Sequence, residues 1–485
     1  MLSSSDRDFF GLLAQAAFAN PFGEDRERID RRLAGAAKGA TREEVMERLL
    51  SRVRERLASL PLADLRRLPA PDRTLIEQAL LFDTFHRYAA SFDAHIHDQL
   101  TRGGRPAKVP FGREALVLLT RAGFDPAESR RYFALFFQLR RAFYFIEHTL
   151  PGASAGMRRL RERLWSNVFT HDARLYARLL WRRMEDFSTF LLGPTGAGKG
   201  IAAAAIGRSG WIPYDEKAEA FAESFVESFL SINLSQFPEA LIESELFGHK
   251  KGAFTGAVEG HEGVFARCSA HGAIFLDEIG EVGVPVQIKL LKVLQERSFS
   301  PVGGHEARRF SGRVIAATNR SLDDLRARGL FRDDFYYRLC SDVIRVPSLA
   351  DRVREEPAEL DVLVAFILRR ILGEDSEEMR ALVRSVIERD LPPDYDWPGN
   401  VRELEQCVRR VVLARGYAGD KRVRPGGEGA VPDDARLLEV AGNESAKGLV
   451  SRYCKALYAK LGTYEEVARH TGLDRRTVKA HLTGR

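Results

Sequence analysis

The chain of 485 residues is poor in cysteine, with only Cys268, Cys340, Cys407 and Cys454, which stand far apart. No Cys-x-x-Cys pair occurs, and no histidine stands at zinc-finger spacing from a cysteine. This pattern excludes a disulfide scaffold and a zinc finger, since both need closely spaced ligands or many cysteines. We therefore expect reduced, buried thiols of the kind found in cytosolic proteins.

Long apolar runs and an N-terminal signal are also missing. No hydrophobic stretch approaches the length of a membrane span, and the N-terminus has no basic segment followed by an apolar one. These absences predict a soluble protein of the cytoplasm. The formal charge of +6 and the pI near 9.1 permit nucleic-acid binding without requiring it.

Residues 1–150 contain few β-branched side chains, with four Val and four Ile. Good helix formers dominate instead, which predicts an all-helical domain. Thr41 and Glu44 form a candidate capping box, and we expect further helices over 74–100 and 126–148. The aromatic stripe of the last helix is typical of packing, although a ligand pocket or dimer face stays open. His95 and His97 would point to different faces of a helix, which argues against a metal site.

A buried strand over 187–192 is followed directly by a glycine-rich loop that ends in Lys199. This order predicts a phosphate-binding loop, in which backbone N–H groups wrap the phosphates and the lysine reaches the terminal ones. The loop consists of Gly193, Pro194, Thr195, Gly196, Ala197, Gly198, Lys199 and Gly200. The usual Ser or Thr after the lysine is replaced by Gly200, so metal binding depends more on a carboxylate elsewhere.

That carboxylate is expected at the end of the apolar segment 272–276, which leads into Asp277 and Glu278. Asp277 would hold Mg²⁺ through its waters, and Glu278 would orient or deprotonate the attacking water. An apolar run before Asp-Glu is weak evidence alone and strong evidence downstream of a phosphate loop.

Between these two motifs lies a loop with a glycine at either side of an aromatic residue, namely Gly252, Ala253, Phe254, Thr255, Gly256 and Ala257. The glycines permit backbone angles that other residues resist, so the loop can change shape. An apolar ring at its tip favours a protein partner. A core aromatic beside a surface turn is the alternative.

At the C-terminus, a Pro- and Gly-rich linker over 424–434 precedes a locally basic segment. Residues 441–485 contain nine Lys or Arg against four Asp or Glu. Ala468, Gly472 and Val478 stand at the spacing of a helix-turn-helix. Its expected DNA contacts are Arg475, Arg476, Thr477, Lys479 and His481. The alternative is a small helical hairpin with a basic, solvated face.

The segment Gly252 to Ala257, preceded by Glu245-Leu-Phe-Gly-His249, resembles the signature loop of the AAA+ activators of sigma-54 RNA polymerase. The resemblance extends from Gly193 to Ala414, and the C-terminal segment resembles the Fis-type module of the same activators. It implies that the loop contacts sigma-54 and that ATP and Mg²⁺ are the cofactors. Two segments are longer than usual for the family. One is the basic helical segment over 169–184 that leads into the ATPase domain, and the other is the stretch between Lys199 and Asn233.

The resemblance also implies roles for five more residues. Asn233 would pair with Glu278, Asn319 would sense the terminal phosphate, and Arg402 would be a second sensor in the helical lid. Arg332 and Arg338, six residues apart, would enter the site of a neighbouring subunit as arginine fingers in a hexameric ring. Surface ion pairing is the alternative for either arginine.

Together these features predict five segments: a helical sensor (1–150), a helical linker (151–186), an AAA+ ATPase domain (187–418), a linker (419–440) and a DNA-binding domain (441–485). The fold class expected is an α-helical region, an α/β P-loop ATPase with a helical lid, and a helix-turn-helix. We expect an ATPase that remodels sigma-54 polymerase while bound to upstream DNA, under the control of an unidentified small-molecule or protein effector. A DNA-binding repressor with a vestigial ATPase, and an AAA+ remodeller of other proteins, are the alternatives.

Overall fold

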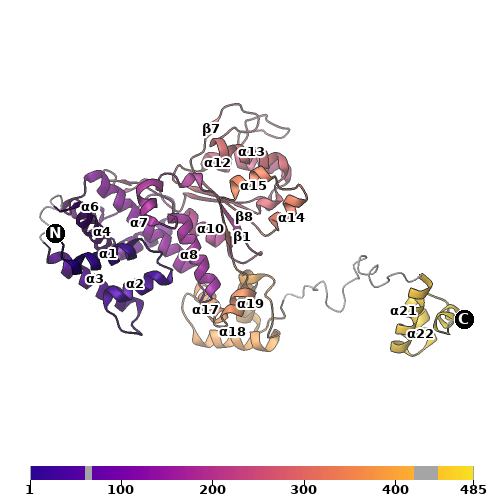
Figure 1. Ribbon diagram of the computed structural model, residues 1–485. Helices are drawn as coiled ribbons and strands as arrows, with labels where there is room; N and C mark the ends of the chain where they lie inside the picture. Colours follow the sequence, from indigo (N-terminus) through magenta and orange to yellow (C-terminus); the bar gives the residue numbers. More distant parts are fainter. Residues whose placement is uncertain (1, 61–67, 420–445, 484–485) are drawn as a thin grey trace. The chain divides into compact units, whose positions relative to one another are not determined.

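The computed structural model describes residues 2–60, 68–419 and 446–483, which fall into two compact units, 1–419 and 420–485 (Figure 1). The expected linker over 419–440 lies, apart from Gly419, outside the described residues. Among the described residues no helix is both long and apolar enough to cross a membrane. The two units are considered separately below.

The first unit begins with an all-helical region, as the composition predicts. Its helices are α1 (Ser4–Phe18), α2 (Glu24–Ala34), α3 (Arg42–Ala58), α4 (Ala70–Arg87), α5 (Ala89–Arg102), α6 (Gly112–Arg121) and α7 (Pro126–Thr149). The capping box at the start of α3 is confirmed, because Thr41 and Glu44 each accept a hydrogen bond from the other's backbone N–H. Asp125 caps α7 by accepting hydrogen bonds from the backbone N–H groups of Ala127 and Glu128.

The single helix predicted over 74–100 is wrong, because α4 ends at Arg87 and α5 begins at Ala89. Tyr88 stands at the break, with φ of −103° and ψ of 8°, and its buried ring stacks on Phe111. The break turns α5 so that Phe92 and Ile96 enter the core. Burial of these aromatic side chains outweighs the small gain from a longer helix.

A linking segment connects this region to the sheet. It consists of α8 (Ala155–Phe169), the short α9 (Ala173–Leu175), one π-helical turn η2 (Tyr176–Leu180) and a 3₁₀ turn η3 (Met184–Asp186). The helical approach expected over 169–184 is therefore broken into short turns. The strand expected from residue 187 begins two residues later, since Phe187 is exposed.

The centre of the unit is a five-stranded parallel sheet in the order β4-β5-β8-β1-β9. Its strands are β1 (Thr189–Leu192), β4 (Phe229–Asn233), β5 (Ala273–Asp277), β8 (Arg313–Thr318) and β9 (Asp342–Arg345). Strands β1, β5 and β8 are nearly continuous runs of buried side chains, as expected for a parallel sheet covered on both faces. Two small hairpins, β2 (Tyr214–Asp215) with β3 (Ala220–Phe221) and β6 (Ser298–Phe299) with β7 (Arg308–Arg309), project from it.

Helices surround the sheet and complete the α/β fold. They are α10 (Lys199–Gly207), η4 (Leu234–Gln236), α11 (Glu239–Phe247), α12 (Val264–Arg267), η5 (Ile279–Glu281), α13 (Val284–Glu296), α14 (Leu322–Ala327) and α15 (Asp333–Leu339). A separate helical cluster follows, with its own core: α16 (Leu349–Glu355), α17 (Glu359–Leu372), α18 (Glu377–Asp390) and α19 (Asn400–Ala414). This cluster is the helical lid expected from the sequence.

The N-terminal helices and the sheet share one hydrophobic core. The hairpin β2–β3 lies against α7, where Phe221 stacks on Phe137 with ring centroids 3.9 Å apart and Tyr214 meets Phe133 edge-on at 4.9 Å. The backbone N–H of Val109 donates to the carbonyl of Glu219 at 2.9 Å. The extra length between Lys199 and Asn233 therefore forms a docking hairpin for the N-terminal helices.

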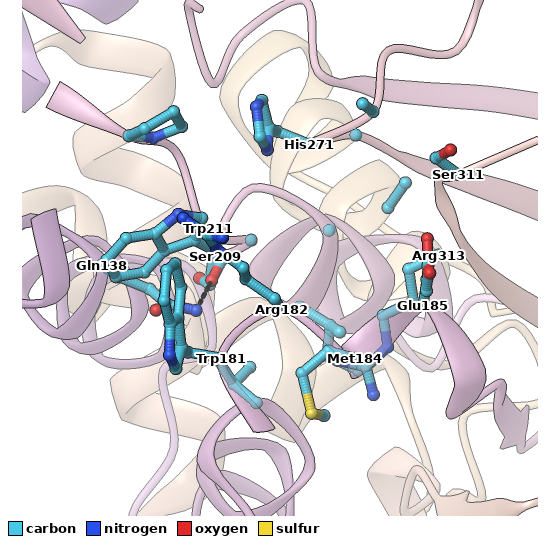
Figure 2. A pocket seen from close by; sticks show the side chains of 18 of the residues that line it. Gln138, Trp181, Arg182, Met184, Glu185, Ser209, Trp211, His271, Ser311 and Arg313 are labelled. Atoms are coloured by element: carbon cyan, nitrogen blue, oxygen red, sulfur yellow. Dashed lines mark hydrogen bonds between the residues drawn. The ribbon is translucent and has the colours of Figure 1, made fainter. Parts of the chain in front are cut away.

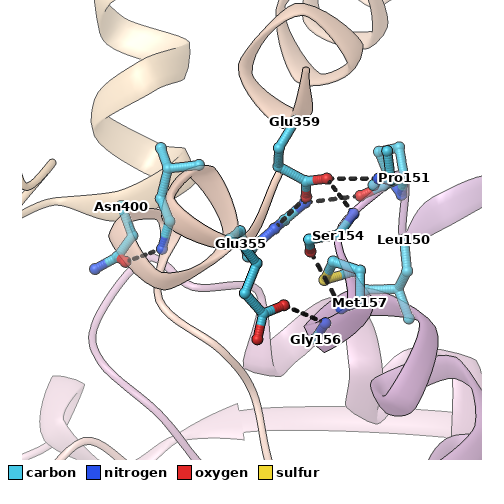
Figure 3. A network of polar contacts seen from close by, with 12 residues as sticks. Leu150, Pro151, Ser154, Gly156, Met157, Glu355, Glu359 and Asn400 are labelled. Atoms are coloured by element: carbon cyan, nitrogen blue, oxygen red, sulfur yellow. Dashed lines mark hydrogen bonds and ion pairs between the residues drawn. The ribbon is translucent and has the colours of Figure 1, made fainter. Parts of the chain in front are cut away.

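The loop between α7 and α8 is held by the lid (Figure 3). The carboxylate of Glu359 accepts hydrogen bonds from the backbone N–H groups of Ala153 and Ser154 and pairs with Arg352, which also donates to the carbonyl of Pro151. Both members of the ion pair are buried. This buried ion pair fixes the junction between the lid and the loop, because either charge would be costly in the interior without the other.

The second unit contains three helices, α21 (Ala446–Leu461), α22 (Tyr464–Thr471) and α23 (Arg475–Thr483). Gly472 ends α22 with φ of +71°, a left-handed conformation that favours glycine. Val478 and Cys454 are fully buried in the small core beneath α23. Two helices, α22 and α23, thus stand on either side of a turn at Gly472, as the spacing of the sequence predicts.

Candidate functional site

The functional side chains predicted from the motifs meet at one edge of the central sheet. The phosphate loop follows the carboxyl end of β1, Asp277 ends β5, and Asn319 follows β8. Asn233, at the end of the outer strand β4, is in register with Asp277. In open α/β sheets ligands bind outside the carboxyl ends of the strands, so the topology alone gathers these groups.

The phosphate loop has a backbone that only glycine tolerates at two places. Gly196 has φ of +78° and Gly198 has φ of +107°, and a Cβ on Gly196 would lie 2.2 Å from the carbonyl oxygen of Gly399 in the lid. At Gly200 a Cβ would meet only Phe275, at 3.8 Å. Packing therefore does not require glycine at the position where a Ser or Thr usually stands.

Lys199 is buried at the start of α10, and its Nζ donates to the carbonyls of Gly193 and Pro194 at 2.8 and 3.2 Å. Burial lowers the pKa of Lys199, against the opposing influence of Glu278 and Asp277. The cation therefore has carbonyl partners only, and it gains from an anionic ligand in the loop.

Asp277 and Glu278 stand at the end of β5 with neither carboxylate neutralised by an ion pair among the described residues. Burial raises the pKa of Asp277, and the nearby Lys199 opposes that shift. A bound divalent cation would favour its charged form. Glu278 has φ of +55°, an uncommon conformation for a side chain with a Cβ, and such backbone outliers cluster at functional sites.

Asn319 joins the two halves of the site. Its backbone N–H donates to Glu278 at 3.2 Å, and its side-chain amide donates to the hydroxyl of Thr195 at 2.8 Å. The exposed amide thus lies between the phosphate loop and the acidic pair.

Asn400 is a site residue that sequence reasoning missed. It begins lid helix α19 with φ of +54°, donates to the carbonyl of Thr195 at 3.0 Å and accepts from the backbone N–H of Leu349 at 2.9 Å. It therefore ties the lid to the phosphate loop. Its place after Pro398 and Gly399, at the break before a helix, is the signal that could have identified it.

The structure places Asn233 and Arg402 differently with respect to the site. The side chain of Asn233 accepts from Ser235 and caps the following turn, so its expected pair with Glu278 is not formed here, and Glu278 contacts the N–H of Asn319 instead. Arg402 lies in the first turn of α19, where its Cβ is 3.1 Å from a Cβ built on Gly196. Its charge also acts on Lys199 and Asp277.

Arg332 is the N-cap residue of α15, Arg338 lies in the last turn of that helix, and α15 packs against α13. Arg332 pairs with Asp334 at 2.7 Å, and Arg338 donates to the carbonyl of Leu294. Within this chain Arg332 therefore contacts an exposed carboxylate, and Arg338 contacts a backbone carbonyl at the end of α13.

The loop over 252–257, called the partner loop below because the sequence predicts that it contacts a protein partner, has a closed base and an exposed tip. The N–H of Gly252 donates to the carbonyl of Ala257 at 2.8 Å, and both Gly252 and Gly256 have positive φ, at +79° and +101°. Phe254 is 39% exposed and rests edge-on against His249. The second loop, over 301–304, is bound to the first, since the N–H of Lys250 donates to the carbonyl of Val302 at 3.0 Å.

In the second unit the expected DNA contacts lie on or beside α23. Arg475, Arg476, Thr477 and Lys479 are exposed, while the ring of His481 contacts the hydroxyl of Ser451 at 2.9 Å. Arg475 pairs with Glu465 of α22. One face of α23 is therefore basic and solvated, and the opposite face carries Val478.

Comparisons with known proteins agree with this geometry. Residues 172–345 match the family described as Sigma-54 interaction domain, and residues 354–420 match the AAA+ ATPase lid domain. The relatives include the Nif-specific regulatory protein of Azotobacter vinelandii, 41% identical over 226 residues, which are 47% of this chain and 40% of that one. The transcriptional regulatory protein GlrR of Escherichia coli is 38% identical over 252 residues, 50% of this chain and 52% of that one.

A third relative, the transcriptional regulatory protein ZraR of Salmonella typhimurium, is 34% identical over 303 residues, 61% of this chain and 63% of that one. The chain thus spans about half the length of the first relatives it matches. A solved structure of NtrX from Brucella abortus aligns with 77% of this chain and 79% of its own, with a TM-score of 0.41 and 22% identity. Residues 172–345 of this chain are therefore a sigma-54 interaction domain of the AAA+ class, and residues 354–420 are its lid.

Proposed function

We propose that this protein is a sigma-54-dependent transcription activator of the cytoplasm, which hydrolyses ATP to convert closed promoter complexes of sigma-54 RNA polymerase into open ones. The observation that carries the proposal is the partner loop, with Phe254 exposed at its tip on the same domain as the assembled nucleotide site. An exposed ring on a loop between two glycines suits a surface that engages and releases a partner. In this role Gly252, Ala253, Phe254, Thr255, Gly256 and Ala257 contact sigma-54.

ATP hydrolysis is assigned to the groups at the sheet edge. The backbone N–H groups of the phosphate loop and Lys199 hold the phosphates, and Asn319 detects the terminal one. Glu278 orients the attacking water and accepts its proton. Mg²⁺ fits this site, because the uncompensated carboxylate of Asp277 faces the same edge and would hold the ion through water. The bound ion would neutralise charge that develops on the phosphates.

A ring of subunits, hexameric as in the family, completes the site. Arg332 and Arg338 lie on the surface of the domain and would reach the phosphates of a neighbouring subunit, where an arginine stabilises the transferring group by roughly 10³ to 10⁵ in rate. Arg402 of the lid would respond to the nucleotide within its own subunit. Upstream DNA would be bound by α23 through Arg475, Arg476, Thr477, Lys479 and His481.

The test is a pair of variants in an open-complex assay with sigma-54 polymerase and supercoiled promoter DNA. Glu278→Ala is expected to bind ATP and lose turnover, while Phe254→Ala is expected to keep turnover and lose open-complex formation. Phe187→Ala is the matched control, because it removes a ring of similar exposure that lies before the amino end of β1, away from the loop and the nucleotide site.

Three results would each overturn part of the proposal. Normal hydrolysis by Glu278→Ala would remove the assigned role of this carboxylate. Absence of ATPase activity in the wild-type chain would favour a DNA-binding repressor with a vestigial motor. Turnover without any binding to sigma-54, even with a transition-state mimic of ATP, would favour a remodeller of other proteins.

A further inference from the structure

A cavity of about 340 Å³ lies at the amino ends of the strands, opposite the carboxyl ends that carry the nucleotide site (Figure 2). It is bounded by α7, by the segment 176–185, by the carboxyl end of α10 with the residues that follow it, and by the amino ends of β5 and β8. The two segments that exceed the usual family length, 169–184 and 199–233, therefore meet in its walls. Its volume falls in the range of small-molecule pockets.

One wall is aromatic. Trp181, from the linking segment, and Trp211, from the stretch before the docking hairpin, pack with ring centroids 4.4 Å apart and planes at 57°. The guanidinium of Arg182 lies over the ring of Trp181, 4.1 Å from its centroid. Figure 2 places the two indoles side by side, with Met184 beyond Arg182. Large flat rings of this kind bind planar aromatic molecules by offset stacking.

The floor of the cavity is polar and already satisfied. Gln138 and Tyr176 exchange hydrogen bonds of 2.6 and 2.8 Å, and the amide of Gln138 also donates to the carbonyl of Ser209 at 2.9 Å. Both side chains are buried. This network holds α7, the linking segment and the end of α10 in place, so the cavity is formed in advance of any ligand.

The charges around the cavity are predominantly positive. Arg313 donates to the carbonyl of Phe187 and to groups of Asn167 and Thr189, all of them neutral acceptors. Arg182 forms no ion pair within the described part of the chain. Glu185 is the one carboxylate in the lining, against these two guanidinium groups. An anionic group on a ligand would therefore be favoured over a cationic one.

We propose that this cavity is a binding site for a small planar aromatic acid, with the ring against Trp181 and Trp211 and the carboxylate facing Arg182. Burial of the ring supplies most of the affinity, and the guanidinium selects the acid over a neutral analogue.

The position of the cavity suggests what the ligand does. Ile206, Gly207 and Ser209, at the carboxyl end of α10, line it. The same helix begins at Lys199, the lysine of the phosphate loop. A ligand that contacts one end of this short helix acts on the orientation of the other, so occupancy changes the rate of ATP turnover. This effect, unlike binding itself, rests on the proposed function.

Binding is tested with naphthalene-2-carboxylate as the probe and naphthalene-2-carboxamide as its neutral counterpart, by isothermal titration against the full chain. The carboxylate is expected to bind saturably and more tightly than the amide. Arg182→Ala should weaken binding of the carboxylate about twofold to fivefold, because an exposed charge pair contributes up to about 1 kcal/mol. Trp211→Ala should weaken it at least tenfold. Arg183→Ala, a change of the exposed neighbour that does not line the cavity, is the matched control.

Each outcome decides one part of the proposal. Equal binding of acid and amide, or equal loss with Arg182→Ala and Arg183→Ala, would overturn the assignment of an anionic ligand. Absence of saturable binding of both probes would overturn the site. Saturable binding with unchanged ATP turnover would refute the coupling through α10. Binding by a chain that hydrolyses no ATP would support the site and contradict the proposed ATPase function.

Discussion

The replacement Glu359→Ala tests the junction between the lid and the N-terminal helices. In the structure Glu359 has no exposed surface, and its carboxylate satisfies the N–H groups of Ala153 and Ser154 at 2.5 and 2.9 Å. It also balances the charge of Arg352, which is 3% exposed. The variant therefore leaves two backbone donors without their acceptor and a buried guanidinium without its counter-charge, with the carbonyl of Pro151 as its remaining acceptor.

The magnitude follows from these contacts. Removing one partner of a buried ion pair costs about 3 to 5 kcal/mol, because the other charge stays buried and uncompensated. The loop over 151–156 would open more readily by that amount. Since about 1.4 kcal/mol corresponds to a factor of ten, hydrogen exchange at these amides should accelerate about 150- to 5,000-fold.

Native-state hydrogen exchange measures this locally, which suits a chain of several parts whose unfolding is not two-state. The amides of Ala153 and Ser154 are the reporters. Glu377→Ala is the matched control, since it breaks an exposed pair with Arg380 on the same lid, a contact worth less than about 1 kcal/mol. The double variant Glu359→Leu with Arg352→Met removes both buried charges, so it should recover much of the lost stability of the lid, but not the protection at Ala153 and Ser154, whose acceptor is still missing.

Two results would refute the reasoning. Unchanged exchange at Ala153 and Ser154 in Glu359→Ala would mean that these hydrogen bonds do not hold the loop. Equal effects of Glu359→Ala and Glu377→Ala would mean that burial of the pair is irrelevant to its strength.

Three further predictions concern other parts of the chain. Burial lowers the pKa of His95 to about 4, so between pH 6.5 and 4 the folded state binds fewer protons than the unfolded state. The stability of the fold should therefore fall as the pH falls through that window, by up to about 3 kcal/mol. The melting temperature of His95→Phe should depend less on pH than that of His97→Ala, an exposed control. Gly196→Ala places a Cβ 2.2 Å from the carbonyl oxygen of Gly399, so equilibrium binding of ATP should weaken at least tenfold. The control Gly200→Ser, where a Cβ meets only Phe275 at 3.8 Å, should keep its affinity for ATP. Equal affinity of the two variants would contradict the role given to Gly196. Arg476→Ala should lower DNA affinity and reduce the slope of log affinity against log salt by about 1, as measured by fluorescence anisotropy, and an unchanged slope would remove Arg476 from the phosphate contacts.

The nucleotide site was predictable from the sequence because its parts obey fixed local spacing. A strand, a glycine-rich turn and a lysine dictate a phosphate loop wherever they occur, and parallel pairing then brings Asp277 and Asn319 to the same edge. The turn at Gly472 and the anchor Val478 were predictable for the same reason. Local spacing does not determine whether Glu278 contacts the side chain of Asn233 or the backbone N–H of Asn319, since that depends on the relative positions of several strands.

The contacts between distant segments could not be predicted. The break at Tyr88 arises from packing against Phe111, a residue on another element, which no periodicity between 74 and 100 reports. The docking hairpin was visible only as extra length, and its partners on α7 lie about 80 residues earlier in the chain. Asn400 owes its role to the lid folding back on the phosphate loop.

The docking hairpin also determines which pieces of the chain can be produced separately. Phe221 and Tyr214 of the sheet domain complete the interior of the N-terminal helices, and Arg141 of α7 donates to the carbonyls of Arg208 and Gly210 just after α10. Removal of these helices would expose the two rings and leave the two carbonyls without their donor. A shortened chain that keeps these contacts must therefore include α7.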